Sequence, residues 1–143
     1  MLVHFPMAFW LLVFPCEFLA WAGELDLGRR IAFWANAAGL ATSLPAALTG
    51  LLDLSGLKTP RSAILGNRHM VFMLSAMAFF GADFFLGMGV GAKSGFTLFL
   101  NLGLSFGGTV LLVCGGWLGG ELVFRHGAGQ ERTIPDETPR SPA

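Results

Sequence analysis

The stretch 66-GNRHMVFM-73 sets the pattern from which the fold is predicted. A polar, basic segment ending in Arg68 and His69 runs directly into an apolar one, which continues to about Val90 with Asp83 as its one charged residue. A helix needs ~20 apolar residues to cross the hydrocarbon of a bilayer, and this segment has that length. We therefore predict a transmembrane helix over about residues 69–90.

The rest of the chain has the same character. Of its 143 residues, 54% are hydrophobic and 13% are charged, whereas soluble domains carry about 25% charged residues. Further apolar segments cover about residues 2–22, 31–54 and 95–124, and residues 23–30 and 55–68 are expected to be loops. Short connections favour antiparallel neighbours. We predict an all-α, integral membrane four-helix up-down bundle over residues 1–126, followed by a polar tail, 127–143, that is disordered unless a partner holds it.

The charges exclude one class of function and suggest an orientation. The net charge is zero and no basic patch accompanies the aromatic residues, so nucleic-acid binding is excluded. Four crossings place both termini on one face of the membrane, here called side A, together with residues 55–68. Side A carries Lys58, Arg61, Arg68, Arg125, Arg132 and Arg140, against Arg29, Arg30 and Lys93 on the opposite side B. Because cytoplasmic loops are enriched in Lys and Arg, we expect side A to be cytoplasmic.

The three histidines all fall on side A. His4 begins the first apolar segment, His69 begins the third and His126 ends the fourth. Imidazole is the usual axial ligand of haem, and four-helix bundles commonly hold a haem between facing histidines. We predict a b-type haem with His4 and His69 as the preferred axial pair and His126 as the other candidate. Further expected contacts are Arg68 and Arg125 to the haem propionates and Asp53 to a histidine N–H.

Other interpretations of the same residues stay open. His69 with Met70, Met73 and Met77 offers soft ligands for copper, although methionines at this spacing also pack as an apolar stripe. The three histidines could form a zinc site, but the sequence has none of the usual zinc-ligand spacings. A single histidine at a membrane boundary is also commonly just an interfacial polar residue.

A second polar layer is predicted near side B. Glu17 lies 13 residues after His4, and Asp83 lies 14 after His69, each about 20 Å deeper along its helix. Asn36 and Asn101 lie near the starts of the segments that leave side B. The four side chains are expected to meet, and ionisable groups within a membrane are candidates for function. They would serve proton movement or quinone binding, or would simply be acids hydrogen-bonded to the asparagines.

Small residues predict close contacts between helices. Ala35, Gly39, Ser43 and Ala47 recur every four residues, and the fourth segment is rich in glycine, which lets helix backbones approach. Cys16 and Cys114 lie in apolar surroundings and are expected to behave as small hydrophobic residues. Ser55, Ser62 and Ser75 have no Gly-x-Ser-x-Gly context, and the chain is not expected to be an enzyme on its own.

Four motifs in this order resemble a known family. They are 3-VHFPMA-8, 49-TGLLD-53, Arg68-His69 and 119-GGELVFRHG-127, and they resemble the bacterial membrane proteins of the domain of unknown function 2231. The resemblance covers the chain to about Gly129. It implies a four-helix domain of the bacterial inner membrane with histidines at matching positions. It also implies partnership with redox domains of the Rieske or quinoprotein dehydrogenase type.

The sequence therefore leads to one preferred function and two alternatives. The preferred function is a membrane haem b-binding subunit that transfers electrons within, or anchors, a larger redox complex. The first alternative is a structural or accessory subunit of a membrane assembly without a cofactor. The second is a membrane protein that binds a quinone or a metal such as copper or zinc.

Overall fold

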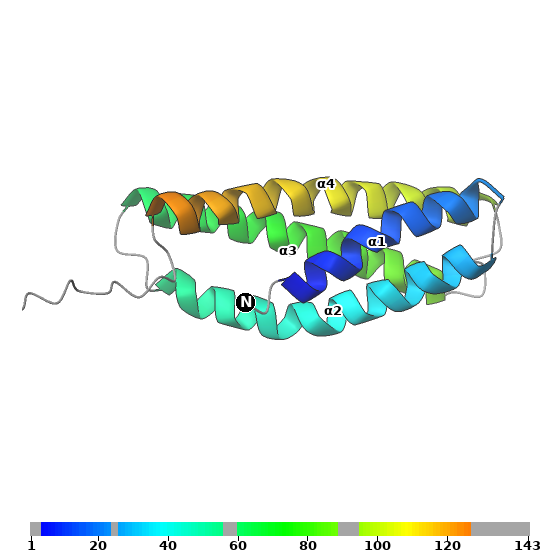
Figure 1. Cartoon of the computed structure of the whole chain (residues 1–143), viewed down its shortest axis with the longest axis horizontal. Helices are drawn as coiled ribbons and strands as arrows, with labels where there is room; N and C mark the ends of the chain where they lie inside the picture. The colour runs from blue at the N-terminus through cyan, green and yellow to red at the C-terminus, as the bar shows by residue number, and fades with distance from the viewer. Residues whose placement is uncertain (1–3, 24–25, 56–59, 89–94, 127–143) are drawn as a thin grey trace, which may run out of the picture.

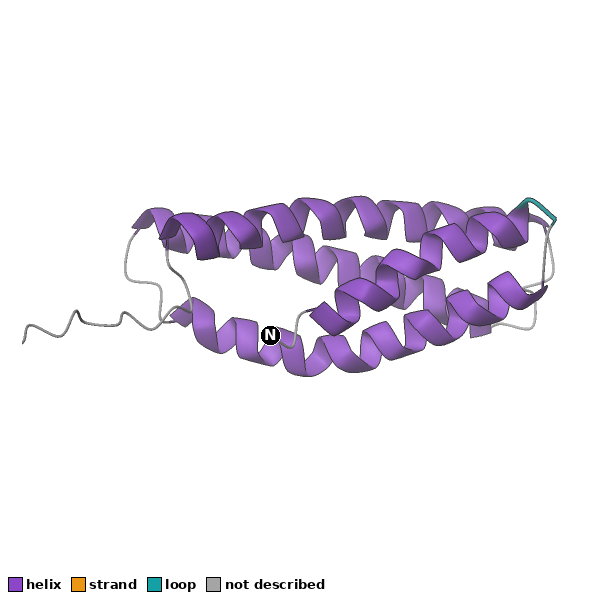
Figure 2. Ribbon diagram, in the orientation of Figure 1, coloured by secondary structure: helices purple, strands orange, loops and turns teal. Residues whose placement is uncertain are grey.

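The computed structural model describes residues 4–23, 26–55, 60–88 and 95–126. It contains four helices: α1 (His4–Trp21), α2 (Asp26–Ser55), α3 (Pro60–Met88) and α4 (Gly95–His126). Nearly all of the described chain is helical (Figure 2). Each helix is long and apolar enough to cross a membrane. The predicted all-α fold is confirmed.

The helices form an up-down bundle in which each packs against two neighbours. The neighbouring pairs are α1–α2, α2–α3, α3–α4 and α4–α1, which makes a closed ring (Figure 1). With 18 residues α1 is the shortest helix, against 29 to 32 for the others, and its first turn lies partway along the bundle. The polar tail, 127–143, lies outside the described residues.

Two helices begin earlier than the sequence pattern predicts. α2 begins at Asp26 rather than near residue 31, and α3 begins at Pro60 rather than at 69. The hydropathy pattern places polar and charged residues in loops, but such residues do not end a helix that extends beyond the apolar layer. Pro60 suits a first helical turn, and Asp26 is stabilised near a helix N-terminus. As a result, His69 lies about 14 Å along α3 and not at its start.

Glycines allow the helices to approach closely, as predicted. A Cβ atom added to Gly39 of α2 would lie 2.5 Å from the Trp10 indole of α1, and one added to Gly108 of α4 would lie 2.9 Å from the Phe80 ring of α3. Distances this short are not tolerated between carbon atoms. Both glycines therefore provide the space into which a large aromatic side chain packs.

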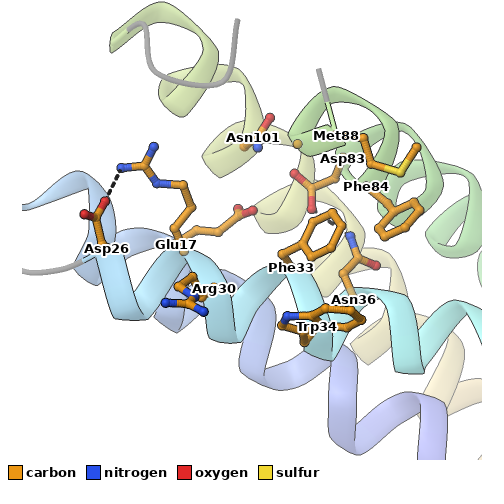
Figure 3. A pocket seen from close by; sticks show the side chains of 12 residues that line it. Glu17, Asp26, Arg30, Phe33, Trp34, Asn36, Asp83, Phe84, Met88 and Asn101 are labelled. Atoms are coloured by element: carbon orange, nitrogen blue, oxygen red, sulfur yellow. Dashed lines mark hydrogen bonds and ion pairs between the residues drawn. The ribbon is translucent and has the colours of Figure 1, made fainter. Parts of the chain in front are cut away.

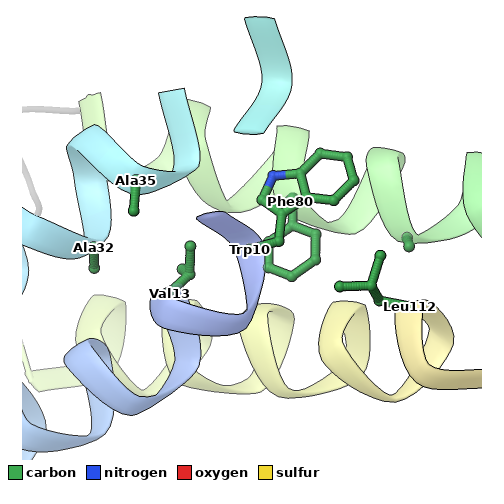
Figure 4. Close-up of a cluster of buried hydrophobic side chains, with 7 residues drawn as sticks. Trp10, Val13, Ala32, Ala35, Phe80 and Leu112 are labelled. Atoms are coloured by element: carbon green, nitrogen blue, oxygen red, sulfur yellow. The ribbon is translucent and has the colours of Figure 1, made fainter. Parts of the chain in front are cut away.

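The buried core is centred on these two aromatic residues. The Trp10 and Phe80 rings are stacked, with centroids 4.8 Å apart and planes 7° from parallel. Figure 4 shows Val13, Leu112 and the small residues of α2 around them. Because Trp10 belongs to α1 and Phe80 to α3, the stack crosses the centre of the ring of helices.

The outer surface is apolar and aromatic. Trp34, Trp117 and Phe124 are 69%, 78% and 87% exposed, among many exposed leucines and phenylalanines. A surface of this kind would make a protein aggregate in water, but it matches the hydrocarbon of a bilayer. Cys16 is half-buried and Cys114 is exposed, and both are free thiols, as expected.

Replacing Gly39 with alanine is expected to lower the free energy of unfolding by about 2 kcal/mol, because the added methyl group overpacks the space held by Trp10. The measurement is unfolding in mixed micelles of a mild and a denaturing detergent. Gly50→Ala on the same helix is the matched control, since a Cβ there meets nothing within 4 Å. Equal stability of the two variants would contradict the packing described here.

Candidate functional site

A cavity of about 710 Å³ lies where α1 ends, α2 begins, α3 ends and α4 begins. This is side B of the bundle. The four polar residues that were predicted to meet all line this cavity (Figure 3). Its lining consists of Glu17, Asp26, Arg29, Arg30, Phe33, Trp34, Asn36, Asp83, Phe84, Gly87, Met88 and Asn101.

The up-down topology explains this convergence. Glu17 lies four residues before the end of α1, and Asp83 lies five before the end of α3. Asn36 and Asn101 follow the starts of α2 and α4, which run in the opposite direction. Residues near the ends of two helices therefore meet residues near the beginnings of the other two.

Two carboxyl groups face each other in the cavity. The side chains of Glu17 and Asp83 are close enough to interact directly, and Figure 3 shows their carboxyl groups turned toward one another. Ser105 of α4 donates a hydrogen bond to Glu17 Oε2 at 2.5 Å. Asn36 Nδ2 donates to Asp83 Oδ2 at 2.8 Å. Each acid is thus held in place by a neutral donor from another helix.

Asn36 connects the acid pair to the core. Trp10 Nε1 donates to Asn36 Oδ1 at 3.2 Å, and Asn36 Nδ2 also donates to the Phe80 carbonyl oxygen at 2.9 Å. The Asn36 side chain is only 1% exposed. Through one buried amide, α2 is therefore bonded to both α1 and α3.

Some hydrogen-bonding capacity in the cavity is unused within the described part of the chain. Asp83 Oδ1 and Asn101 Oδ1 are buried oxygens without a hydrogen-bond donor there. Buried polar atoms normally have partners, so these two oxygens require one. A protonated carboxyl group, a water molecule or a bound ligand would supply the missing donors.

Aromatic rings and charged groups complete the cavity walls. Phe33 and Phe84 are stacked with centroids 5.0 Å apart and planes 20° from parallel. Arg29 and Asp26, in the first turn of α2, form an ion pair at 3.4 Å. The cavity therefore combines flat apolar surfaces, hydrogen-bonding groups and charges, the usual composition of a small-molecule site.

The structure describes the side chains of some, but not all, of the predicted ligand residues on side A. His69 Nδ1 lies 2.7 Å from the Gly115 carbonyl oxygen, and the imidazole packs on Gly119 of α4. His4 is exposed in the first turn of α1, and Arg68 is exposed on α3. Arg125 forms an ion pair with Glu121 at 2.9 Å. The side chains of Asp53 and His126 lie outside the described part.

These positions do not test the predicted metal and haem ligands. Among the described side chains, no three His, Cys, Asp or Glu residues come together to hold a metal ion. A site formed by all three histidines would include His126, whose side chain lies outside the described part. The haem, copper and zinc sites therefore stay predictions.

The sequence reasoning missed several residues of the cavity. Ser105 was not singled out, although it lies four residues after Asn101 and therefore on the same face of its helix. Trp10 was also missed, although its N–H requires a partner when it is buried. Phe33 and Phe84 gave no signal, because an aromatic residue in a membrane helix faces lipid as readily as a cavity.

Fold and cavity together define a four-helix integral membrane protein with an acidic, partly aromatic site between its helices. The chain belongs to the predicted membrane protein family DUF2231, whose model matches residues 1–132. The resemblance noted in the sequence is thereby confirmed. No curated protein and no solved structure matches the chain.

Proposed function

We propose that this protein binds a small molecule of the quinone class in the side B cavity, with the Glu17–Asp83 pair as its hydrogen-bonding partner. The observation that carries the proposal is the contact between the two carboxyl groups inside the cavity. An ionisable group within a bilayer is costly and rarely lacks a role. Two such groups in contact make a structural role alone a poor explanation.

The contact between the carboxyl groups favours a shared proton. Two carboxylates side by side in a medium of low dielectric constant repel strongly, so one of them takes up a proton. The pair then donates one hydrogen bond and accepts others. It is suited to the carbonyl oxygen of a quinone or to the hydroxyl group of a quinol.

The remaining walls suit the same class of ligand. Phe33, Trp34 and Phe84 provide flat surfaces for a ring. Asn101 adds a second hydrogen-bonding group, because its amide N–H can donate to a quinone carbonyl and its buried, unpaired Oδ1 can accept from a quinol hydroxyl. The volume of about 710 Å³ lies within the range of sites for small molecules.

The proposal is tested by binding a short-tailed benzoquinone to the purified protein, followed by quenching of tryptophan fluorescence. Glu17→Gln and Asp83→Asn are each expected to weaken binding about tenfold. Glu121→Gln is the matched control, because this carboxyl group lies near the other end of α4 beside Arg125. Gel filtration and circular dichroism establish that each variant is folded.

Infrared spectroscopy detects the shared proton independently of quinone binding. The carbonyl band of a protonated carboxyl group is expected in the wild-type protein and in Glu121→Gln. Its frequency or intensity is expected to change in Glu17→Gln and Asp83→Asn, because each substitution removes one member of the pair. A wild-type protein that binds no quinone, or that lacks the band, would contradict the proposal.

Haem binding is the second candidate function, and one contact favours it. A carbonyl oxygen only accepts hydrogen bonds, so His69 Nδ1 carries the proton in its contact with Gly115, which leaves Nε2 as the ring nitrogen that could bind a metal. Histidines that ligate metals commonly donate their other ring N–H to a carbonyl group in this way. Haem, when bound, would supply electron transfer, and His69 with either His4 or His126 would hold it.

A reduced-minus-oxidised absorption spectrum of the purified protein tests this second function. Sharp haem bands are expected in the wild-type protein and in the control Asn67→Ala, an exposed position two residues away. The bands are expected to be lost in His69→Ala, because the iron loses a ligand. A colourless, iron-free wild-type protein would argue against haem.

Both functions agree with a location in the bacterial inner membrane, with side A in the cytoplasm and a redox complex as the partner. Arg61, Arg68 and Arg125 on side A, against Arg29 and Arg30 on side B, support this orientation. A quinone reaches the cavity from the bilayer, and electrons would then be supplied or removed by another subunit.

A further inference from the structure

We infer that a groove between α2 and α3 receives the hydrocarbon tail of the molecule whose head occupies the side B cavity. The ligand is then a long-tailed amphiphile and not a small water-soluble ring compound. The inference rests on the proposed function and specifies its ligand.

The groove is apolar throughout. It has a volume of about 500 Å³ and lies between two helices that pack less closely than α1–α2 or α3–α4. A Cβ added to Gly81 would meet nothing within 4 Å, so the absent side chain leaves space there. The groove is lined by Leu40, Ala41, Leu44, Leu74, Met77, Ala78, Gly81, Phe84 and Phe85.

The groove and the cavity adjoin each other at Phe84. Phe84 lines both of them, so its ring forms a wall common to the polar and the apolar compartments. On α2, the groove begins at Leu40, one helical turn beyond the cavity residue Asn36. A molecule bound in the cavity can therefore extend into the groove along the same two helices.

The direction of the groove matches the orientation of a membrane lipid. Arg29 and Arg30 lie at the start of α2, where the polar headgroup region is expected. From Phe84 to Leu74 the groove extends about 15 Å along α3, away from these charges and toward the middle of the bilayer. A head near the charged end and a tail toward the centre is the arrangement of a lipid-soluble quinone.

A tail fits this groove better than a helix of another subunit does. A helix has a diameter of about 10 Å and packs along several turns of its neighbour. The groove occupies only the part of α3 between Leu74 and Phe85 and has the volume of a small-molecule site. Its position next to the cavity adds a reason for one ligand to occupy both.

Two benzoquinones with the same ring test the inference, one with a methyl group and one with a decyl tail. Ala78→Phe fills the groove and is expected to weaken binding of the decyl compound about tenfold, with binding of the methyl compound unchanged. Ala82→Phe is the matched control, because Ala82 is exposed on the same helix but does not line the groove. This control is expected to bind both compounds like the wild-type protein.

A photoreactive group at the end of the decyl tail locates the tail directly. Crosslinks are expected on peptides containing residues 40–44 and 74–78, and they should disappear in Ala78→Phe. Crosslinks on the outer faces of α1 and α4, or on a second copy of the chain, would overturn the tail assignment. Failure of the methyl compound to bind the wild-type protein would instead refute the proposed function, so the two failures are distinguishable.

Discussion

Asn36→Leu is expected to lower the free energy of unfolding by about 3 kcal/mol, although leucine has the same branching and the same number of side-chain heavy atoms as asparagine. The substitution removes the acceptor for Trp10 Nε1 and the donor to Asp83 Oδ2, and it leaves both partners buried. The cost comes from these unpaired groups and not from lost packing, since an unsatisfied buried group costs about 1–3 kcal/mol. The measurement is reversible unfolding in mixed detergent micelles.

Thr42→Val provides the matched control for Asn36→Leu. The Thr42 hydroxyl bonds only to carbonyl groups of its own helix, at 2.7 and 3.2 Å, and it links no second helix. Its replacement is expected to change the unfolding free energy by less than about 0.5 kcal/mol. If both variants unfold alike, Asn36 does not join the helices as described.

Phe80→Ala is expected to cost about 4 kcal/mol, the second large effect. The Phe80 ring is fully buried, stacks on Trp10 and fills the space above Gly108. Its removal opens a void at the centre of the bundle, which small neighbours cannot fill. The same unfolding measurement applies, and the fluorescence of Trp10 should change because its stacking partner is lost.

Phe99→Ala separates this effect from a general loss of apolar area. Phe99 is 62% exposed on α4 and faces the lipid side. Lipid surrounds this ring before and after the helices associate, so its removal is expected to cost less than about 1 kcal/mol. A loss as large as that of Phe80→Ala would mean that the core does not dominate stability.

The sequence was sufficient for the fold because long apolar segments in a membrane have few alternatives to helices. It also predicted the meeting of Glu17, Asn36, Asp83 and Asn101, since helix rise and alternating direction fix the depth of each residue. The starts of α2 and α3 were predicted too late, because the pattern marks where the apolar layer begins and not where hydrogen bonding between backbone groups begins.

The sequence does not predict which side chains within the polar layer contact each other. Depth alone does not say which way a side chain points around its helix, so the pairing of Glu17 with Asp83 and the role of Ser105 required the packing of all four helices. The groove was missed for a related reason. Its residues look like any lipid-facing stripe, and only the spacing of α2 and α3 leaves room between them.

The long sequence separations within the polar layer have a consequence for biosynthesis. Trp10 and Asn36 are 26 residues apart and can bond as soon as the first two helices have entered the bilayer. The hydrogen bond from Asn36 to Asp83 forms only after the chain has been extended by another 47 residues. The hydrogen bond to Glu17 requires Ser105, which is 88 residues after it. Because ribosomes make the chain from its N-terminus, a truncated product ending before α4 inserts an acid without its hydroxyl partner. We expect membrane quality-control proteases to degrade such fragments, because Glu17 then lies in the bilayer without its hydrogen-bond donor.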